Sequence, residues 1–179
     1  MKKHERALAV PARRSAAALV LALSFGVGRA AAACDPPSPV NNATVTCTGT
    51  TTDQNNPNGY GSVTDTGNTI NVQSGASVTG TATGLLFNAG TVNNAGTVSG
   101  GLDSGILAGA NTNVTNSGTI KASAGQAIFG GQAVTVTNST TGTISGASGI
   151  FGDIAANVTN SGTISAGRTA SASTAARPR

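Results

Sequence analysis

The chain has 179 residues, of which 25 are glycine, 3% are aromatic and 9% are charged. A soluble globular domain ordinarily carries about 25% charged residues, so this chain is unusually poor in charge. The formal net charge of +4 comes from the first 33 residues, because from Cys34 onward four bases and five acids remain, a net charge of −1. Without a basic stripe to neutralise phosphates, the chain is not expected to bind nucleic acid.

The chain begins with the three parts of a secretory signal peptide. Residues 1–14 are basic, residues 16–27 form an apolar run, and Ala31-Ala32-Ala33 offers a small-residue cleavage site. The apolar run of 12 residues is too short to span about 30 Å of hydrocarbon as a helix, which disfavours an uncleaved anchor. We predict a signal peptide over 1–33, cleaved before Cys34 or one residue earlier. The expected destination is the cell surface or the medium if the chain is translocated, and otherwise the periplasm.

The mature chain has two cysteines, Cys34 and Cys47, both near its start. A disulfide between them is chemically reasonable in an exported protein, and a loop of roughly 14 residues would be worth about 3 kcal/mol in the chain-entropy model. We predict that residues 34–67 form an N-terminal cap that contains this Cys34–Cys47 loop. Two alternatives stay open: free thiols, or a lipid on Cys34, although Ala31 stands where lipid attachment usually requires leucine.

A repeat of 22 residues runs through the rest of the chain. A fixed period of about 20 to 50 residues marks a stacked repeat architecture. Three series keep this interval: Val92, Val114, Val136 and Val158; Asn94, Asn116, Asn138 and Asn160; and Ile106, Ile128 and Ile150.

The clearest copies of the repeat are residues 114–120 and 158–164, both Val-Thr-Asn-Ser-Gly-Thr-Ile. Thr, Val and Ile favour extended structure, whereas Ser-Gly is typical of turns, where glycine is able to take a positive φ. The copy at 136–144 contains two additional residues, an even number that keeps its two apolar flanks on the same face. These patterns predict an all-β fold, a right-handed parallel β-helix (β-solenoid) of about five 22-residue coils over 68–167.

Equivalent side chains of such a stack lie about 4.8 Å apart. The valine series is therefore expected to form an internal aliphatic ladder. The asparagine series is expected either to form an amide ladder between coils or only to tolerate turn geometry, and the sequence leaves both open. No cap is recognisable after the last coil, and an uncapped end exposes strand edges that invite pairing with another chain.

The leader, the Cys-flanked segment rich in Asn and Thr, and the repeat motif together resemble the N-terminal passenger region of a bacterial autotransporter, the type V secretion family. Asn-Ser-Gly-Thr-Ile stands at 116–120 and 160–164, with variants at 94–98 and 138–144, and the resemblance covers roughly residues 1–166. The resemblance implies a right-handed β-helix that is exposed outside the outer membrane and serves in adhesion.

Members of that family end in a translocator barrel, which we do not carry over because no segment of this chain alternates like barrel strands. Residues 168–179 hold three of the four bases of the mature chain and lack the apolar cluster that the repeat would place near residue 172. We expect this segment to be either a disordered tail or a frame-shifted sequence that truncates the passenger.

Residues suited to catalysis are scarce. The lone histidine, His4, lies in the leader, so a Ser-His-Asp or Cys-His arrangement is not expected in the mature chain. No two of the five aspartates lie one 22-residue period apart, so paired carboxylates for glycoside hydrolysis are not predicted. We predict no catalytic residue, no metal and no cofactor.

We therefore expect a non-catalytic, surface-exposed structural or adhesive passenger fragment whose ligand is an unidentified surface or glycan. One alternative is a stand-alone secreted β-solenoid that binds carbohydrate or ice. Flat threonine ladders can order water, but Thr-x-Thr is expected in register only at Thr135 and Thr137. A secreted carbohydrate-active enzyme is a further alternative, which the missing histidine and the scattered acids disfavour.

Overall fold

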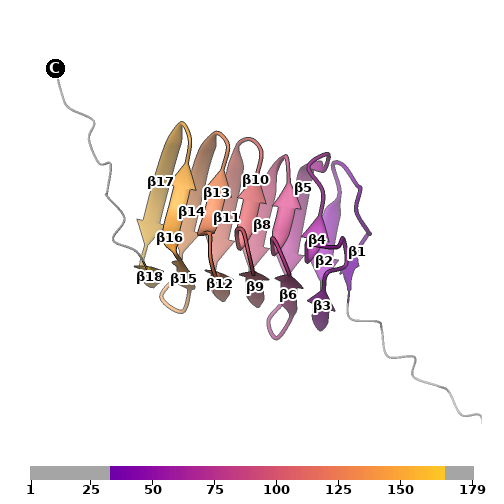
Figure 1. Ribbon diagram of the computed structural model, residues 1–179, viewed down its shortest axis with the longest axis horizontal. Coiled ribbons are helices and arrows are strands. Elements are labelled where there is room, and N and C mark those ends of the chain that lie inside the picture. Colours follow the sequence, from indigo (N-terminus) through magenta and orange to yellow (C-terminus); the bar gives the residue numbers. More distant parts are fainter. Residues whose placement is uncertain (1–32, 168–179) are drawn as a thin grey trace, which may run out of the picture.

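The computed structural model describes residues 33–167, which form an elongated stack of eighteen short β-strands (Figure 1). The strands wind in successive coils, and every strand pairing between coils is parallel. The predicted all-β solenoid is therefore confirmed. No helix in this part of the chain is long and apolar enough to cross a membrane. The tail predicted over 168–179, and all of the predicted leader except Ala33, lie outside the described residues.

The coils build three sheets, of seven, six and five strands. The first sheet contains β1 (Cys34–Asp35), β2 (Thr44–Cys47), β5 (Thr66–Val72), β8 (Ala89–Asn94), β11 (Thr112–Asn116), β14 (Ala133–Asn138) and β17 (Ala155–Asn160), in this order. The second contains β3 (Thr50–Thr52), β6 (Ser77–Gly80), β9 (Thr97–Gly100), β12 (Thr119–Ala122), β15 (Thr143–Gly146) and β18 (Thr163–Ala166). The third contains β4 (Tyr60–Gly61), β7 (Leu85–Phe87), β10 (Ile106–Ala108), β13 (Gln126–Gly130) and β16 (Ser148–Gly152).

The 22-residue period is the register between coils. Val114 pairs with Val92 on one side and with Val136 on the other. Because successive side chains of a strand point to opposite faces, these valines point into the solenoid and their threonine and asparagine neighbours point outward. The three valines are at most 2% exposed, which confirms the internal aliphatic ladder over these coils.

The stack has six coils rather than the predicted five. Strands β2, β3 and β4 pair with β5, β6 and β7, so a first coil lies inside the segment 34–67 that was predicted as a cap. Its spacing to the next coil is 25 residues from Val45 to Ile70 and 27 from Thr51 to Val78. This coil lacks the repeat motif, and for that reason the period does not reveal it.

The cap proper is the segment before this first coil. Strand β1 pairs antiparallel with β2 and ends the first sheet. A disulfide joins Cys34 to Cys47, as predicted, so the alternatives of free thiols and of a lipid on Cys34 do not fit the structure. The buried Tyr60 donates its hydroxyl to the Pro36 carbonyl oxygen at 2.7 Å, which fastens the cap to the third sheet.

The opposite end of the stack has no such cover within residues 33–167. Val136 is 1% exposed, whereas Val158, its counterpart in the last coil, is 43% exposed. Ile150 and Ile164 of that coil are only partly buried, whereas their counterparts Ile128 and Ile144 are 0% exposed. The last members of the valine and isoleucine series are thus in register but lie at the edge of the core.

The two additional residues of the copy at 136–144 are absorbed without a change of face. Ile144 pairs with Ile120 and with Ile164, as the even insertion predicted. The coil then shortens at its next corner, where Ala147 alone joins β15 to β16, whereas residues 123–125 join β12 to β13. Each coil therefore closes in register on the previous one.

The glycines of the repeat are required by close stacking of the turns. A Cβ atom on Gly118 would collide with the carbonyl oxygen of Gly96 in the preceding coil. Positive φ angles occur among the described glycines at Gly49, Gly61, Gly67 and Gly75. The motif glycines Gly96, Gly118, Gly142 and Gly162 are not among them, so the repeat uses glycine at this position for space and not for a positive φ.

Candidate functional site

The asparagine series forms a continuous amide ladder inside the solenoid. Asn94 Nδ2 donates to Asn116 Oδ1 at 2.8 Å. Asn116 Nδ2 donates to Asn138 Oδ1 at 2.8 Å, and Asn138 Nδ2 donates to Asn160 Oδ1 at 2.7 Å. The first three asparagines are at most 2% exposed. The ladder alternative is therefore confirmed, and because these amides bond to one another they stabilise the fold rather than face a ligand.

The amide ladder begins at Asn94 because Val72 occupies the equivalent position in the preceding coil. Asn94 Oδ1 consequently has no hydrogen-bond partner within the described residues. The side-chain amide still donates to the Gly96 carbonyl oxygen of its own turn at 3.3 Å. The start of the ladder thus coincides with the start of the regular repeat.

The outer face of the first sheet carries two columns of threonine and asparagine. The residues directly before and after the inward-pointing valine or isoleucine of each coil form these columns, and the parallel pairings hold them in register over six coils. We name this surface the Thr/Asn array; it consists of Thr44, Thr69, Thr91, Asn113, Thr135 and Asn157 in one column, and Thr46, Asn71, Asn93, Thr115, Thr137 and Thr159 in the other. Neighbours lie about 4.8 Å apart along a column and roughly 7 Å apart between columns.

The Thr/Asn array is uncharged, and its members are exposed or half-buried. One hydrogen bond joins two of them, from Asn93 Nδ2 to Asn71 Oδ1 at 2.9 Å. The other side chains of the array make no hydrogen bond within residues 33–167, so their hydroxyl and amide groups are free to bond to water or to a ligand. Threonine is stiff about χ1, which holds these hydroxyls in a regular arrangement.

The outer face of the second sheet is comparable but less uniform. Its outward side chains are threonines and serines, together with Lys121, the one base among residues 33–167. Its outward pairs are Thr50 and Thr52, Ser77 and Thr79, Thr97 and Ser99, Thr119 and Lys121, Thr143 and Ser145, and Thr163 and Ser165. The charge and the smaller serines distinguish this face from the Thr/Asn array.

The outer face of the third sheet carries an apolar column. Leu86, Leu107, Phe129 and Phe151 stand in register there. The rings of Phe129 and Phe151 are stacked, with centroids 5.7 Å apart and an interplanar angle of 12°. Because the two rings face each other along the column, they do not lie flat on the surface as platforms for a sugar ring.

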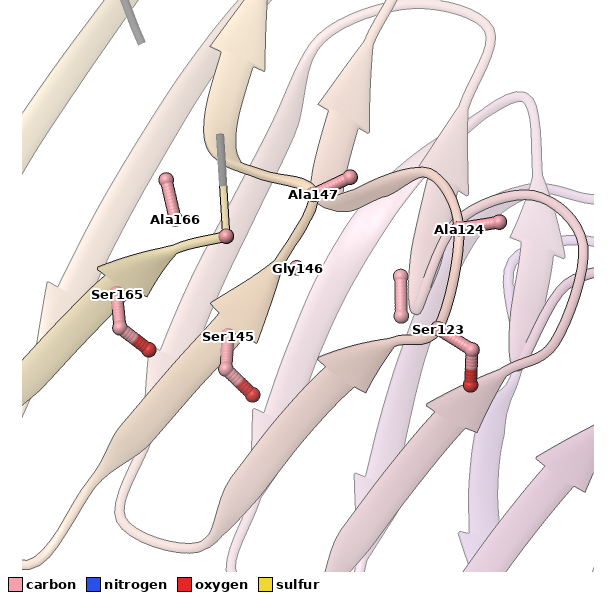
Figure 2. A pocket seen from close by; sticks show the side chains of 9 residues that line it. Ser123, Ala124, Ser145, Gly146, Ala147, Ser165 and Ala166 are labelled. Atoms are coloured by element: carbon pink, nitrogen blue, oxygen red, sulfur yellow. The ribbon is translucent and has the colours of Figure 1, made fainter. Parts of the chain in front are cut away.

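A shallow recess lies at the corner between β15 and β16, where Ala147 alone makes the turn (Figure 2). Its lining consists of alanine, serine and glycine from three successive coils, residues 122–124, 145–147 and 165–167. None of these residues has a titratable side chain. The recess therefore offers a few hydroxyl and backbone groups and no chemistry of its own.

The ionisable side chains are spread along the stack. Within residues 33–167 no three His, Cys, Asp or Glu residues lie close enough to hold a metal ion. Asp53 accepts hydrogen bonds from the Thr81 hydroxyl and the Thr81 backbone N–H, both at 2.6 Å, and these bonds lower the pKa of its carboxyl. Burial, together with the nearby carboxylates of Asp65 and Asp35, raises the pKa of the Tyr60 hydroxyl far above its usual range. These groups fasten the cap and the first coil.

Sequence reasoning missed the Thr/Asn array as a whole. Thr135 and Thr137 were expected to be the one Thr-x-Thr pair in register, but Thr44 and Thr46 form a second pair on the same face. An asparagine of one coil often pairs with a threonine of the next, as Asn93 does with Thr115, so the array is not a repeat of one residue type. The polar–apolar–polar alternation around each ladder valine was the signal that could have found it.

No protein-family model, curated protein or solved structure matches this chain.

Proposed function

We propose that the chain is an exported, non-catalytic β-solenoid that acts as an adhesive passenger at the cell surface, as its resemblance to autotransporter passengers implies. The observation that supports adhesion is the Thr/Asn array, an uncharged face over six coils whose polar groups, apart from the Asn93–Asn71 pair, make no hydrogen bond within residues 33–167. The Cys34–Cys47 disulfide supports export, because disulfides persist in oxidising compartments.

The chemistry of the Thr/Asn array favours an extended neutral ligand. A hydrogen bond contributes only about 1 kcal/mol net, so a small molecule that contacts the array residues of one or two coils gains little binding free energy. A surface that engages many rows at once gains from multivalency. Since the array carries no charge, it attracts neither phosphates nor acidic polymers. A neutral glycan surface with regularly spaced hydroxyl groups fits these requirements.

Retention of the protein on insoluble neutral polysaccharides tests this proposal. The variant Thr115→Lys/Thr137→Lys places two charges in the middle of the Thr/Asn array. The matched control is Thr119→Lys/Thr143→Lys on the second sheet, where the native Lys121 shows that an outward lysine is compatible with the fold. We expect the first variant to lose retention and the control to keep it. Equal retention of both variants, or none of the wild type, contradicts a contact through the array.

Export is tested separately, by expressing the full chain in a Gram-negative host. We expect mass spectrometry to find the leader removed before Cys34, and we expect protease added to intact cells to degrade the product when the chain is joined to a translocator barrel. The variant Leu19→Arg/Leu21→Arg, which interrupts the apolar run of the leader, serves as the control and should keep the chain in the cytoplasm. A cleaved but protease-protected product would place the chain in the periplasm, and an uncleaved wild type in the cytoplasm would overturn export.

Ice binding is the second candidate function. The observation that favours it is the presence of Thr-x-Thr in two rows of the array, at Thr44/Thr46 and at Thr135/Thr137. Measurement of thermal hysteresis separates the two candidates. A glycan-binding passenger should show none, whereas a hysteresis that disappears in Thr115→Lys/Thr137→Lys would favour ice.

A further inference from the structure

We propose that the open C-terminal end of the stack is a dimer interface, at which β17 pairs antiparallel with β17 of a second copy of this chain about a two-fold axis. The inference does not depend on the proposed function, because it concerns the last coil and not the ligand of the Thr/Asn array.

The two ends of the stack differ in how their strand edges are protected. At the N-terminal end, β1 pairs antiparallel with β2, and the disulfide and the Pro36 contact to Tyr60 cover the apolar interior, while β3 and β4 end their sheets. At the other end, β16, β17 and β18 each have a neighbouring strand on one side only, within the described residues. Natural sheets protect such edges with lysine, proline or bulges. The coil 148–167 contains none of these protective residues, and Asp153 is its one charged side chain.

This unprotected edge also exposes the apolar interior. Val158 is 43% exposed, and Ile150 and Ile164 are only partly buried, while the corresponding ladder valine of the preceding coil, Val136, is buried. Contiguous apolar patches on a protein surface commonly mark interaction sites. A partner that covers this end would bury these side chains and pair the free backbone groups of three strands at once.

A second copy of the chain can meet these requirements in one arrangement. Head-to-tail stacking is disfavoured, because at the N-terminal end β1 already pairs with β2, and Val45 and Tyr60 there are 0% exposed and leave no apolar surface to cover. Two identical C-terminal ends can meet only isologously, about a two-fold axis. A two-fold axis perpendicular to the first sheet, midway between β17 and its copy, reverses the strand direction, so that β17 meets its copy antiparallel and β16 meets the copy of β18. The three-sided outline of the coil is preserved by this operation.

The pleat restricts the register of this contact. Opposite residues of an antiparallel pair must point to the same face, so one residue of β17 must lie opposite its own copy. Near the middle of β17 (Ala155–Asn160), that residue is either Asn157 or Val158. In both registers the first sheet continues from one copy into the other, and the two Thr/Asn arrays join into one face of double length.

The mass of the mature chain in solution is the first test. Sedimentation equilibrium of residues 34–179 over the micromolar range should give a dimer. The variant Val158→Lys places a charge next to its own copy at the interface and should give a monomer, with circular dichroism to verify that the solenoid is folded. Thr137→Lys, one coil away and on the outer face, is the matched control and should remain dimeric. A monomeric wild type, or an open series of larger assemblies, would overturn the proposal.

Cysteine cross-linking tests the axis itself. If Asn157 lies opposite its own copy, the variant Asn157→Cys should form a disulfide between the two copies. If Val158 lies opposite its own copy, the variant Asn157→Cys should instead cross-link with the variant Thr159→Cys when the two are mixed. Thr135→Cys is the control, because the two copies of this position would be three strand spacings, about 14 Å, apart, too far for a disulfide. Cross-linking of the control, or of neither test, contradicts a two-fold contact at β17.

Discussion

Asn116 Nδ2 donates to Asn138 Oδ1 at 2.8 Å, and the two residues are separated by one coil of 22 residues. The same amide also donates to the Gly118 carbonyl oxygen of its own turn at 3.1 Å. One side chain therefore joins a turn to the next coil. A slip of one residue between coils would turn this amide away from its neighbour, so the ladder specifies the register as well as stabilising it.

Asn116→Val should be strongly destabilising, although the equivalent position of an earlier coil is naturally Val72. The substitution leaves Asn138 Oδ1 without its partner and removes the donor to the carbonyl oxygens of Gly118 and Thr143. Asn94 Nδ2 keeps its hydrogen bonds to the carbonyl oxygens of Gly96 and Thr119. Each buried unpaired group costs about 1 to 3 kcal/mol, so we expect a loss of about 3 kcal/mol in the free energy of unfolding, measured with urea. Asn160→Val, at the exposed end of the ladder, is the control and should lose clearly less; equal losses would show that the ladder is not cooperative.

Gly118→Ala should destabilise the solenoid by about 3 kcal/mol, because its Cβ atom would strike the backbone of Gly96, which cannot move without disturbing its own coil. Gly75→Ala is the comparison, since Gly75 has a positive φ of 77° but open space around it. Backbone strain alone should cost about 1 to 2 kcal/mol there. If thermal denaturation shows Gly75→Ala to be the more harmful change, close stacking is not what requires the motif glycine.

Deletion of Thr140 together with Thr141 should be tolerated, because it restores the motif Val-Thr-Asn-Ser-Gly-Thr-Ile and keeps Ile144 on the inner face. We expect a change of less than about 1 kcal/mol in the free energy of unfolding, since short changes in turns are thermodynamically mild. Deletion of Thr140 alone should cost clearly more, because it shifts the parity between β14 and β15. Urea denaturation of the two deletions decides between them, and similar stabilities would mean that the turn absorbs a change of either parity.

Reduction of the Cys34–Cys47 disulfide should lower the free energy of unfolding by about 3 kcal/mol, as expected for a loop of roughly 14 residues in the chain-entropy model. The same loss is expected in Cys34→Ser/Cys47→Ser. Added reductant should have no effect on that variant, which makes it the internal control. A reductant effect of equal size in the variant would trace the loss to something other than the disulfide.

Alkaline pH should destabilise the protein through Tyr60. Burial and the nearby Asp65 and Asp35 carboxylates raise the pKa of its hydroxyl in the folded state, whereas the unfolded chain releases this proton near about pH 10. Above that pH the folded state binds more protons than the unfolded state, so stability falls as the pH rises. Because Tyr60 is the one tyrosine of the chain, tyrosinate absorbance reports its titration directly. The absorbance should appear together with unfolding, and its appearance in a still-folded protein would contradict the prediction.

The repeat made most of the fold predictable. The spacing alone predicts that Val92, Val114 and Val136 lie on the same face, because a stack of equal coils brings residues one period apart into contact. The disulfide was predicted from two cysteines that closely follow a predicted signal peptide. The first coil could not be found in the same way, since Val45 and Ile70 pair across a spacing that the rest of the chain does not use.

The candidate site was harder to predict from the sequence than the fold. The Thr/Asn array combines residues such as Asn93 and Thr115, which share a column through register and not through residue type. Whether the asparagines tolerated turns or bonded between coils also depended on where each amide lay relative to the next.

The sequence by itself therefore determined the architecture: the coil length, the inward apolar ladders and the cross-linked N-terminal end. It could do so because apolar alternation and a fixed period act locally and repeat in every coil. Only the tertiary structure decided why the motif glycines are needed, how the two ends of the stack differ, and which polar side chains gather on one face. Those properties depend on contacts between coils and on exposure at the ends, and both arise only when distant parts of the chain are brought together.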